Sequence, residues 1–229
     1  MRWIGIPQAK SYKLLISIVV LTLLNTTSYH LTKADIEPVI KPDFVLIEEP
    51  SPHLKIEEVL WKDKDAKKHL GNKIPRVAIK ALELYDRYKN EGLTLSIIMG
   101  VMKVESSFNP RAISKGSDGF TPVAYGLMQV VRSTAQPILK NMGKVWTTEL
   151  ALQPEFSMEV GVFHLMNLHR RFVIKGIEEK NEFHLSLIAY NRGEQLVLDA
   201  VDMSKRVPVS LEYLGKVKVA SKKWGKIEF

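Results

Sequence analysis

The chain has 229 residues, 45% of them hydrophobic, which is enough for one domain of ordinary size with extensions and a substantial core. It contains no cysteine, so disulfide bonds, thiolate metal sites and a cysteine nucleophile are excluded. The formal net charge of +8 is concentrated at the two ends: residues 1–34 carry +4 and residues 212–229 carry +3, which leaves +1 for the middle. Nucleic-acid-binding proteins carry basic side chains across their folded elements, so this distribution argues against nucleic acid as a partner.

The N-terminal segment has the pattern of an export signal. Lys10 and Lys13 precede residues 14–24, an apolar run of eleven residues with only two polar members. This run is short for a transmembrane helix of about 20 residues and fits the apolar region of a signal peptide. The cleavage pattern at residues 26–28 is poor, so cleavage and retention as an inner-membrane anchor both stay open. Either way, the sequence predicts a protein of the periplasm or cell envelope.

The next segment predicts a linker followed by one folded domain. Residues 35–56 contain four prolines and no helical period, which is typical of an extended linker. A short charged helix is expected over residues 57–70, with Gly71 as its end. We therefore divide the chain into a signal or anchor (1–34), a linker with a charged helix (35–73) and a compact domain (74–229).

The compact domain is predicted to be all-α, with about seven helices. Apolar residues recur at helical spacing throughout it, and no convincing alternation of period two is present. A long loop rich in glycine and proline is expected at residues 108–126. The expected helices start near residues 75, 95, 133, 154, 185, 196 and 211.

Glu105 is the most informative single residue. It lies three and seven positions after Met102 and Ile98, on the face of a helix that is expected to turn inward. A carboxyl against apolar surface is disfavoured as an anion, so we expect its pKa to rise towards neutrality. Such a group can donate a proton at physiological pH. On position alone, the favoured interpretation is a solvated glutamate at a fraying helix end, because charged groups are rarely buried unless they are paired or functional.

Three short motifs decide between these interpretations. Residues 105–110 (ESSFNP) are followed by residues 126–129 (GLMQ) and then by residues 189–193 (AYNRG). In this order they resemble the motifs of the lytic transglycosylases with a goose-type lysozyme-like SLT domain, in particular the branch of membrane-bound murein transglycosylase C. The resemblance covers about residues 75–222. It implies a lysozyme-like helical fold with the long loop beside the catalytic glutamate.

The resemblance also implies a substrate and a reaction. Enzymes of this family cleave the bond between N-acetylmuramic acid and N-acetylglucosamine in peptidoglycan glycan strands and leave a 1,6-anhydro muramyl end. One carboxyl acts first as acid and then as base, and no cofactor is required. By resemblance Glu105 is this catalytic group. The resemblance further assigns substrate contacts to Ser114, Met128, Gln129, Tyr190 and Asn191, with Tyr190 positioning the acid.

Two other functions stay open. A hydrolytic muramidase needs a second carboxyl to activate water, and Asp118 is the only acid between Glu105 and Glu149. A catalytically weak wall-binding module that anchors an envelope-spanning secretion complex or a phage assembly is the alternative of a different class. Metal chemistry has no support, because His164 and His169 lack the spacing of a metal-binding pair.

The basic C-terminal end also has two interpretations. Five lysines lie between residues 216 and 226, at the end of the last predicted helix. They could meet an anionic polymer. The favoured explanation is a solvated helix end, where the helix dipole favours positive charge.

Overall fold

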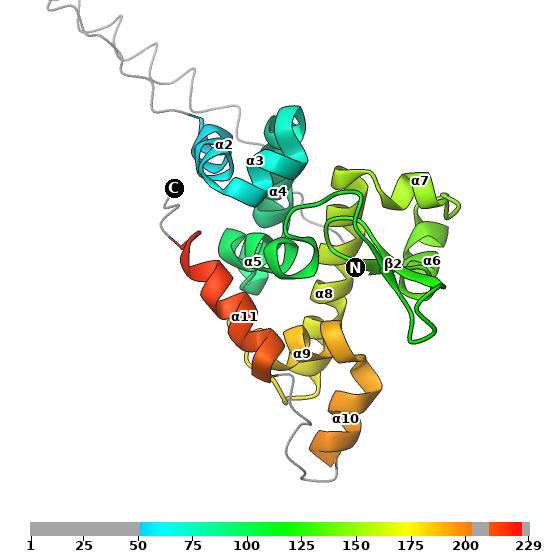
Figure 1. Ribbon diagram of the computed structural model, residues 1–229. Coiled ribbons are helices and arrows are strands. Elements are labelled where there is room, and N and C mark those ends of the chain that lie inside the picture. The colour runs from blue at the N-terminus through cyan, green and yellow to red at the C-terminus, as the bar shows by residue number, and fades with distance from the viewer. Residues whose placement is uncertain (1–50, 203–210, 226–229) are drawn as a thin grey trace, which may run out of the picture. The chain divides into compact units, whose positions relative to one another are not determined.

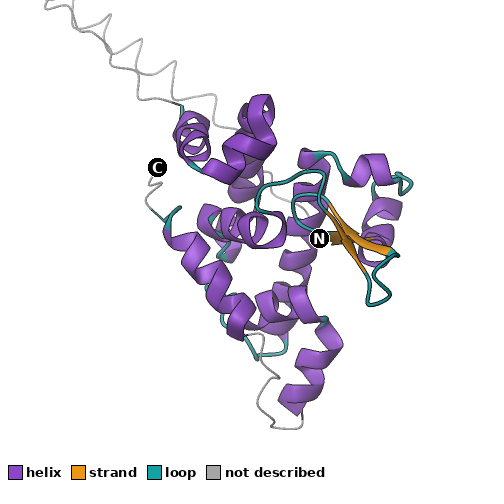
Figure 2. Ribbon diagram, in the orientation of Figure 1, coloured by secondary structure: helices purple, strands orange, loops and turns teal. Residues whose placement is uncertain are grey.

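The computed structural model describes residues 51–202 and 211–225 (Figure 1). The predicted export signal and most of the predicted linker lie outside the described residues. Helices make up most of the described chain (Figure 2), and none of the described helices is long and apolar enough to cross a membrane. The helices are α2 (Pro52–Lys62), α3 (Lys64–Leu70), α4 (Ile74–Tyr88), α5 (Leu95–Ser106), α6 (Arg132–Asn141), α7 (Thr148–Ala151), α8 (Pro154–Ile174), α9 (His184–Arg192), α10 (Glu194–Asp202) and α11 (Leu211–Lys222).

Every helix predicted from the sequence is present, and α7 is an additional one-turn helix. Its four residues are too few to show a period, but Thr147 caps it by accepting a hydrogen bond from the Leu150 N–H at 3.1 Å. The charged helix expected over residues 57–70 is two helices, α2 and α3, because Asp63 interrupts it in an extended conformation. The Asp63 carboxylate accepts hydrogen bonds from the N–H groups of Asp65 and Ala66 and so begins α3.

Helix α2 is part of the compact unit, which runs from Glu49. Ile56 and Leu60 of α2 are completely buried and pack in the same core as α4. The segment predicted as a linker with a charged helix therefore supplies two packed helices. A functional boundary at residue 74 stays a prediction.

The predicted long loop, residues 108–126, contains two strands of a small antiparallel sheet whose third strand follows the loop. Strand β1 (Ile113–Lys115) pairs with β2 (Pro122–Tyr125), and β2 pairs with β3 (Val130–Val131). These strands have two to four residues, and the register of β1 and β2 is irregular after Ser114. Elements this short show no clear alternation of apolar and polar residues, which is why the sequence indicated only a loop.

Helices α5 and α11 pack along each other (Figure 1). Gly100 of α5 makes this close approach feasible: a Cβ atom there would lie 3.1 Å from the Val217 carbonyl oxygen and would overlap the Ser221 hydroxyl. Beyond Gly100, Trp224 is almost fully buried and packs edge-on against Phe108, with ring centroids 5.6 Å apart. The last helix is thus fixed against the helix that carries Glu105.

The start of α9 is held by a buried carboxylate from the preceding loop. Oε1 of Glu178 accepts hydrogen bonds from the N–H groups of Leu185 at 2.7 Å and Ser186 at 3.1 Å. Its Oε2 accepts from the Ser186 hydroxyl and lies 3.1 Å from Nδ1 of His169, whose ring stacks on Phe183. A carboxylate here satisfies amide groups that would otherwise be unpaired and opposes the positive end of the helix dipole.

We expect Glu178→Ala to lower the free energy of unfolding by about 3–5 kcal/mol, since it leaves several buried donors without an acceptor. The urea midpoint measures this loss. Glu179→Ala removes a neighbouring exposed carboxylate and is the matched control, with an expected change within about 0.5 kcal/mol. Equal midpoints for the two variants would contradict a capping role for Glu178.

Candidate active site

Glu105 lies in the last turn of α5, and its side chain is half-buried. The helix forms because Thr94 caps its start and because Ile98, Val101 and Met102 pack into the core. Burial raises the pKa of the Glu105 carboxyl, while a hydrogen bond from Tyr213 opposes that effect; the net shift is upward. The carboxyl is therefore a better proton donor at neutral pH than an exposed glutamate.

Tyr213 is the hydrogen-bond partner of this acid. Its hydroxyl donates to Oε1 of Glu105 at 2.6 Å. Burial, together with the neighbouring carboxyl of Glu105, raises the pKa of Tyr213 strongly, so the phenol stays protonated and remains a donor. This contact joins α5 to α11 and orients the carboxyl of Glu105. The second carboxyl oxygen, Oε2, is not part of this hydrogen bond.

The chain reverses direction directly after the acid. Ser107 and Phe108 both have positive φ angles, 51° and 61°, which cost non-glycine residues about 1–2 kcal/mol each. Two hydrogen bonds back to α5 and the complete burial of Phe108 offset that cost. The Ser106 hydroxyl donates to the carbonyl oxygens of Met102 at 3.1 Å and Leu127 at 2.9 Å. It thereby ties the end of α5 to the segment that contains the GLMQ motif.

The GLMQ motif forms the turn opposite Glu105. Met128 has no exposed surface, and its N–H donates to the Ser157 hydroxyl at 3.1 Å. Gln129 uses its amide to hold the loop, because Nε2 donates to the carbonyl oxygens of Ala112 and Gly126 while Oε1 accepts from the Ser114 hydroxyl. Substrate contacts of Ser114, Met128 and Gln129 stay predictions.

Tyr190 lies near the acid but bonds elsewhere. Its hydroxyl donates to the Met128 carbonyl oxygen at 2.7 Å. Burial and the nearby charge of Glu105 raise the pKa of Tyr190 well above its ordinary value. Gly161 of α8 makes room for this contact, since a Cβ atom there would lie 2.6 Å from the Met128 Cβ and 3.0 Å from the Tyr190 hydroxyl. The structure thus gives Tyr213 the hydrogen bond to the acid that the resemblance assigned to Tyr190.

A cavity of about 270 Å³ opens on Glu105. It lies between the end of α5, the end of α9 and the start of α11, which contribute Glu105, Asn191 and Tyr213 respectively. Asn191 therefore lines the same cavity as Glu105, and its substrate contact stays a prediction. Arg192, Glu212 and Lys216 complete a polar rim. Among the described residues no three His, Asp or Glu side chains are grouped so that they could hold a metal ion.

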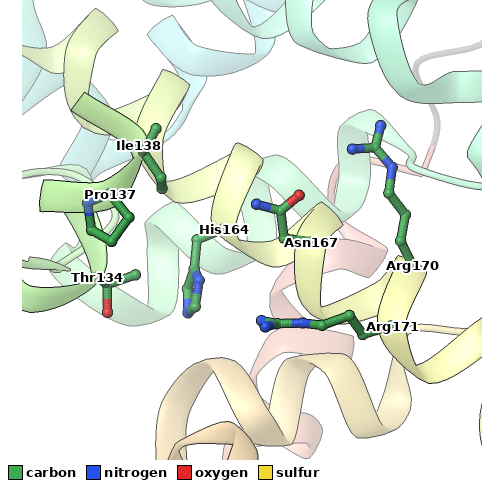
Figure 3. A pocket seen from close by; sticks show the side chains of 7 residues that line it. All are labelled: Thr134, Pro137, Ile138, His164, Asn167, Arg170 and Arg171. Atoms are coloured by element: carbon green, nitrogen blue, oxygen red, sulfur yellow. The ribbon is translucent and has the colours of Figure 1, made fainter. Parts of the chain in front are cut away.

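A larger cavity of about 410 Å³ lies between α6 and α8, and Figure 3 shows its lining. Its His164 is next to Tyr190, with ring centroids 5.5 Å apart. Burial, and to a smaller extent Arg171, lowers the pKa of His164 to about 4. His164 is therefore neutral at physiological pH, and Glu105 is the better candidate for a proton donor.

Asp118 has a local structural role. It lies in the turn between β1 and β2, where its carboxylate accepts hydrogen bonds from the N–H groups of Phe120 and Thr121 and from the Thr121 hydroxyl. These bonds lower the pKa of this exposed carboxyl, which makes it a weaker base.

The family model described as "Transglycosylase SLT domain" matches residues 85–210. The chain belongs to this family. The match includes Glu105, the GLMQ motif and Tyr190, and it confirms the resemblance seen in the sequence. Tyr213 lies just beyond it.

The chain is also similar in sequence to individual transglycosylases. The chain is 34% identical over 122 residues to "Membrane-bound lytic murein transglycosylase C" of Haemophilus influenzae strain PittEE, a match covering 52% of this chain and 32% of that protein. The Serratia proteamaculans protein of the same name is 36% identical to the chain over 140 residues, a match that covers 59% of this chain and 34% of that protein. The chain thus spans about a third of the length of these curated relatives.

The fold is also that of a known SLT enzyme. The X-ray structure of an inactive mutant of lytic transglycosylase Slt from Pseudomonas aeruginosa superposes with a TM-score of 0.51 at 22% identity, covering 72% of this chain and 26% of that one. This likeness confirms the predicted helical, lysozyme-like fold class.

Tyr213 is the site residue that the sequence did not single out. No spacing rule connects it to Glu105, because the two residues lie 108 positions apart. The one feature of the sequence that could have indicated a role for Tyr213 is the presence of a tyrosine on the apolar face of the last helix.

We expect Tyr213→Phe to raise the pKa of Glu105 further, because the hydrogen bond that stabilises the carboxylate is lost while the ring still excludes water. Carbon-13 NMR titration of labelled glutamate measures the change, and Glu105→Gln assigns the resonance. In the control Tyr190→Phe the hydroxyl that is removed bonds to a carbonyl, so a smaller change is expected. A lower Glu105 pKa in Tyr213→Phe would contradict this account.

Proposed function

We propose that this protein is a peptidoglycan lytic transglycosylase in which Glu105 is the single acid and base. The observation that carries the proposal is a half-buried carboxyl with a raised pKa, oriented by Tyr213 and open to a cavity. The family membership and the names of the relatives support the same function.

The proposed reaction needs only one carboxyl. Protonated Glu105 gives its proton to the glycosidic oxygen as the bond between that oxygen and C1 of the N-acetylmuramyl residue breaks. The resulting carboxylate takes the proton from the 6-hydroxyl of the same residue, and O6 bonds to C1. The anhydro ring closes, Glu105 is protonated again, and no water is consumed. Tyr213 orients the carboxyl and stabilises its ionised form between the two steps.

The hydrogen bonding of Asp118 supports this reaction over hydrolysis. A water-activating base needs a carboxylate that faces the sugar, at about 6.5–9.5 Å from the acid. Both carboxylate oxygens of Asp118 are hydrogen-bonded within its own turn, and its pKa is lowered.

Glu105→Gln is expected to reduce the rate of cleavage of purified sacculi by at least about 10²–10⁴-fold, because an amide cannot donate the proton. Mass spectrometry of the released fragments measures both the rate and the chemistry, with anhydro-muramyl ends expected from the wild type. Asp118→Asn is the control and should release the same anhydro ends at a rate near that of the wild type. Reducing ends that disappear in Asp118→Asn would establish the muramidase alternative instead.

The inactive variant should remain folded. The raised pKa means that the contribution of Glu105 to stability is fully present below its ordinary pKa of 4.5 and is lost as pH rises through the folded-state value. Glu105→Gln should therefore be at least as stable as the wild type at pH 8, with this advantage vanishing below pH 4.5. Thermal unfolding at the two pH values tests this expectation. A large loss of stability at pH 8 would mean that inactivity reports unfolding.

We also propose that the protein acts in the periplasm or cell envelope. The predicted export signal and the words "membrane-bound" in the names of the relatives support this location. Inner-membrane association through residues 14–24 and participation in a secretion or phage complex remain proposals of the same kind. A wall-binding module without catalysis predicts retention on sacculi and no released fragments, so the digestion described above also tests it.

A further inference from the structure

The segment from Lys62 to Lys73 carries an excess of positive charge. It contains five lysines and two acids, Asp63 and Asp65. Both carboxylates form ion pairs at 2.8 Å with Lys103, which belongs to α5. The two acids are therefore engaged with a lysine from outside the segment rather than with the lysines of the segment itself.

Three of these lysines lie on one exposed face. Lys64, Lys67 and Lys68 are at positions i, i+3 and i+4 of α3, on the face away from the two residues that this helix buries. Lys73 follows them in the short turn at residues 71–73. None of these four lysines forms an ion pair with another residue that the structure describes. We call Lys64, Lys67, Lys68 and Lys73 the α3 lysines.

Exposed apolar side chains of α2 border the α3 lysines. Leu54 and Trp61 lie seven positions apart, and so on one face of α2, and they are 45% and 43% exposed. Glu58, which lies between them on this face, is paired with Lys62. Trp61 precedes Lys64 by three residues, and α2 and α3 pack together (Figure 1). The chain thus presents an exposed indole beside a group of ammonium groups.

We propose that the α3 lysines and Trp61 dock the folded domain on an anionic phospholipid surface. Basic clusters on a helix are attracted to anionic headgroups, and tryptophan rings lie at the level of those headgroups. An anionic polysaccharide would engage the lysines but offers no apolar layer for Leu54 and Trp61. This docking requires no catalysis. It also differs from an anchor at residues 14–24, because it uses the folded domain itself.

Docking at this surface has a consequence for the orientation of the acid. Lys103 lies two residues before Glu105 on α5, and its ion pairs hold Asp63 and Asp65 at the start of α3. The Lys103 ammonium also lies over the ring of Phe108, 5.4 Å from its centroid. Since these contacts join α3 to the end of α5, a docked domain keeps Glu105 at a fixed position relative to the lipid surface.

The lack of native cysteine allows a site-specific test with the full chain. Asn72 is exposed beside the α3 lysines, whereas Glu179 is exposed near the far end of α4, where the next residue, Lys180, lies against Gly92. Helix α4 runs between the two sites and has 15 residues, so they are about 20 Å apart. A fluorescent label is attached to Asn72→Cys or to Glu179→Cys, and the vesicles carry an energy acceptor on their headgroups.

The two labels should respond differently to anionic lipid. Energy transfer from the label at position 72 should be stronger on vesicles of mixed phosphatidylglycerol and phosphatidylcholine than on vesicles of phosphatidylcholine alone. Transfer from the label at position 179 should change much less. An equal response of both labels, or no response to phosphatidylglycerol, would overturn the proposal.

Charge reversal tests the α3 lysines directly. The readout is the ratio of the partition coefficients on phosphatidylglycerol-containing and on neutral vesicles, because this ratio cancels the contribution that residues 14–24 make to both. Lys67→Glu/Lys68→Glu should lower the ratio roughly tenfold or more, and added salt should reduce the difference from the wild type. Lys218→Glu/Lys222→Glu on α11 changes two exposed lysines and the same net charge, and should keep the ratio within about twofold. An equal fall in both double variants would reject a docking site at α3.

Two further measurements separate lipid docking from its alternatives. Trp61→Ser should weaken binding to the phosphatidylglycerol vesicles; unchanged binding would mean that the lysines form a general polyanion site, and would reject lipid docking. Cleavage of purified sacculi in solution should be the same for Lys67→Glu/Lys68→Glu and the wild type, because the α3 lysines do not line the cavity at Glu105. A wild type that binds these vesicles but does not cleave sacculi would reject the transglycosylase function and leave the docking surface in place.

Discussion

The packing of α11 against α5 is the constraint on which the proposed chemistry depends. It removes water from one side of Glu105 and supplies the one hydroxyl that orients the carboxyl. Burial alone would favour the protonated acid but hinder its ionisation. The hydrogen bond from Tyr213 partly restores the stability of the carboxylate. A group that must be an acid in one step and a base in the next needs both effects in balance.

The remaining structure holds that balance in place through contacts around the end of α5. The turn at Ser107 and Phe108 carries backbone strain, which the buried ring of Phe108 offsets. Ser106 links the turn to the GLMQ segment, and Tyr190 links that segment to α9. Glu178 fixes where α9 begins. Each contact fixes an element that surrounds the end of α5.

Sequence reasoning found the acid but not its partner, for a physical reason. Glu105 lies on a helix whose apolar period is local, so its inward position could be predicted from the two preceding turns of that helix. Its bond to Tyr213 joins distant segments, and nothing in local spacing encodes it. The small sheet was not predicted because its strands are too short for a period. The first turn of α2 falls in the predicted linker, because the four prolines of residues 35–56 outweighed the one buried apolar residue Ile56.

Gly100 makes the acidity of the site depend on the spacing between two helices. Because no side chain separates α5 from α11 at this point, the backbone distance there sets how far the Tyr213 hydroxyl reaches towards Glu105. One methyl group at position 100 would act as a wedge between the helices, admit water to the carboxyl and return its pKa towards the ordinary value. The pKa of Glu105 would then be adjustable from a residue that does not line the cavity at Glu105, and NMR titration of Glu105 in Gly100→Ala would reveal the change.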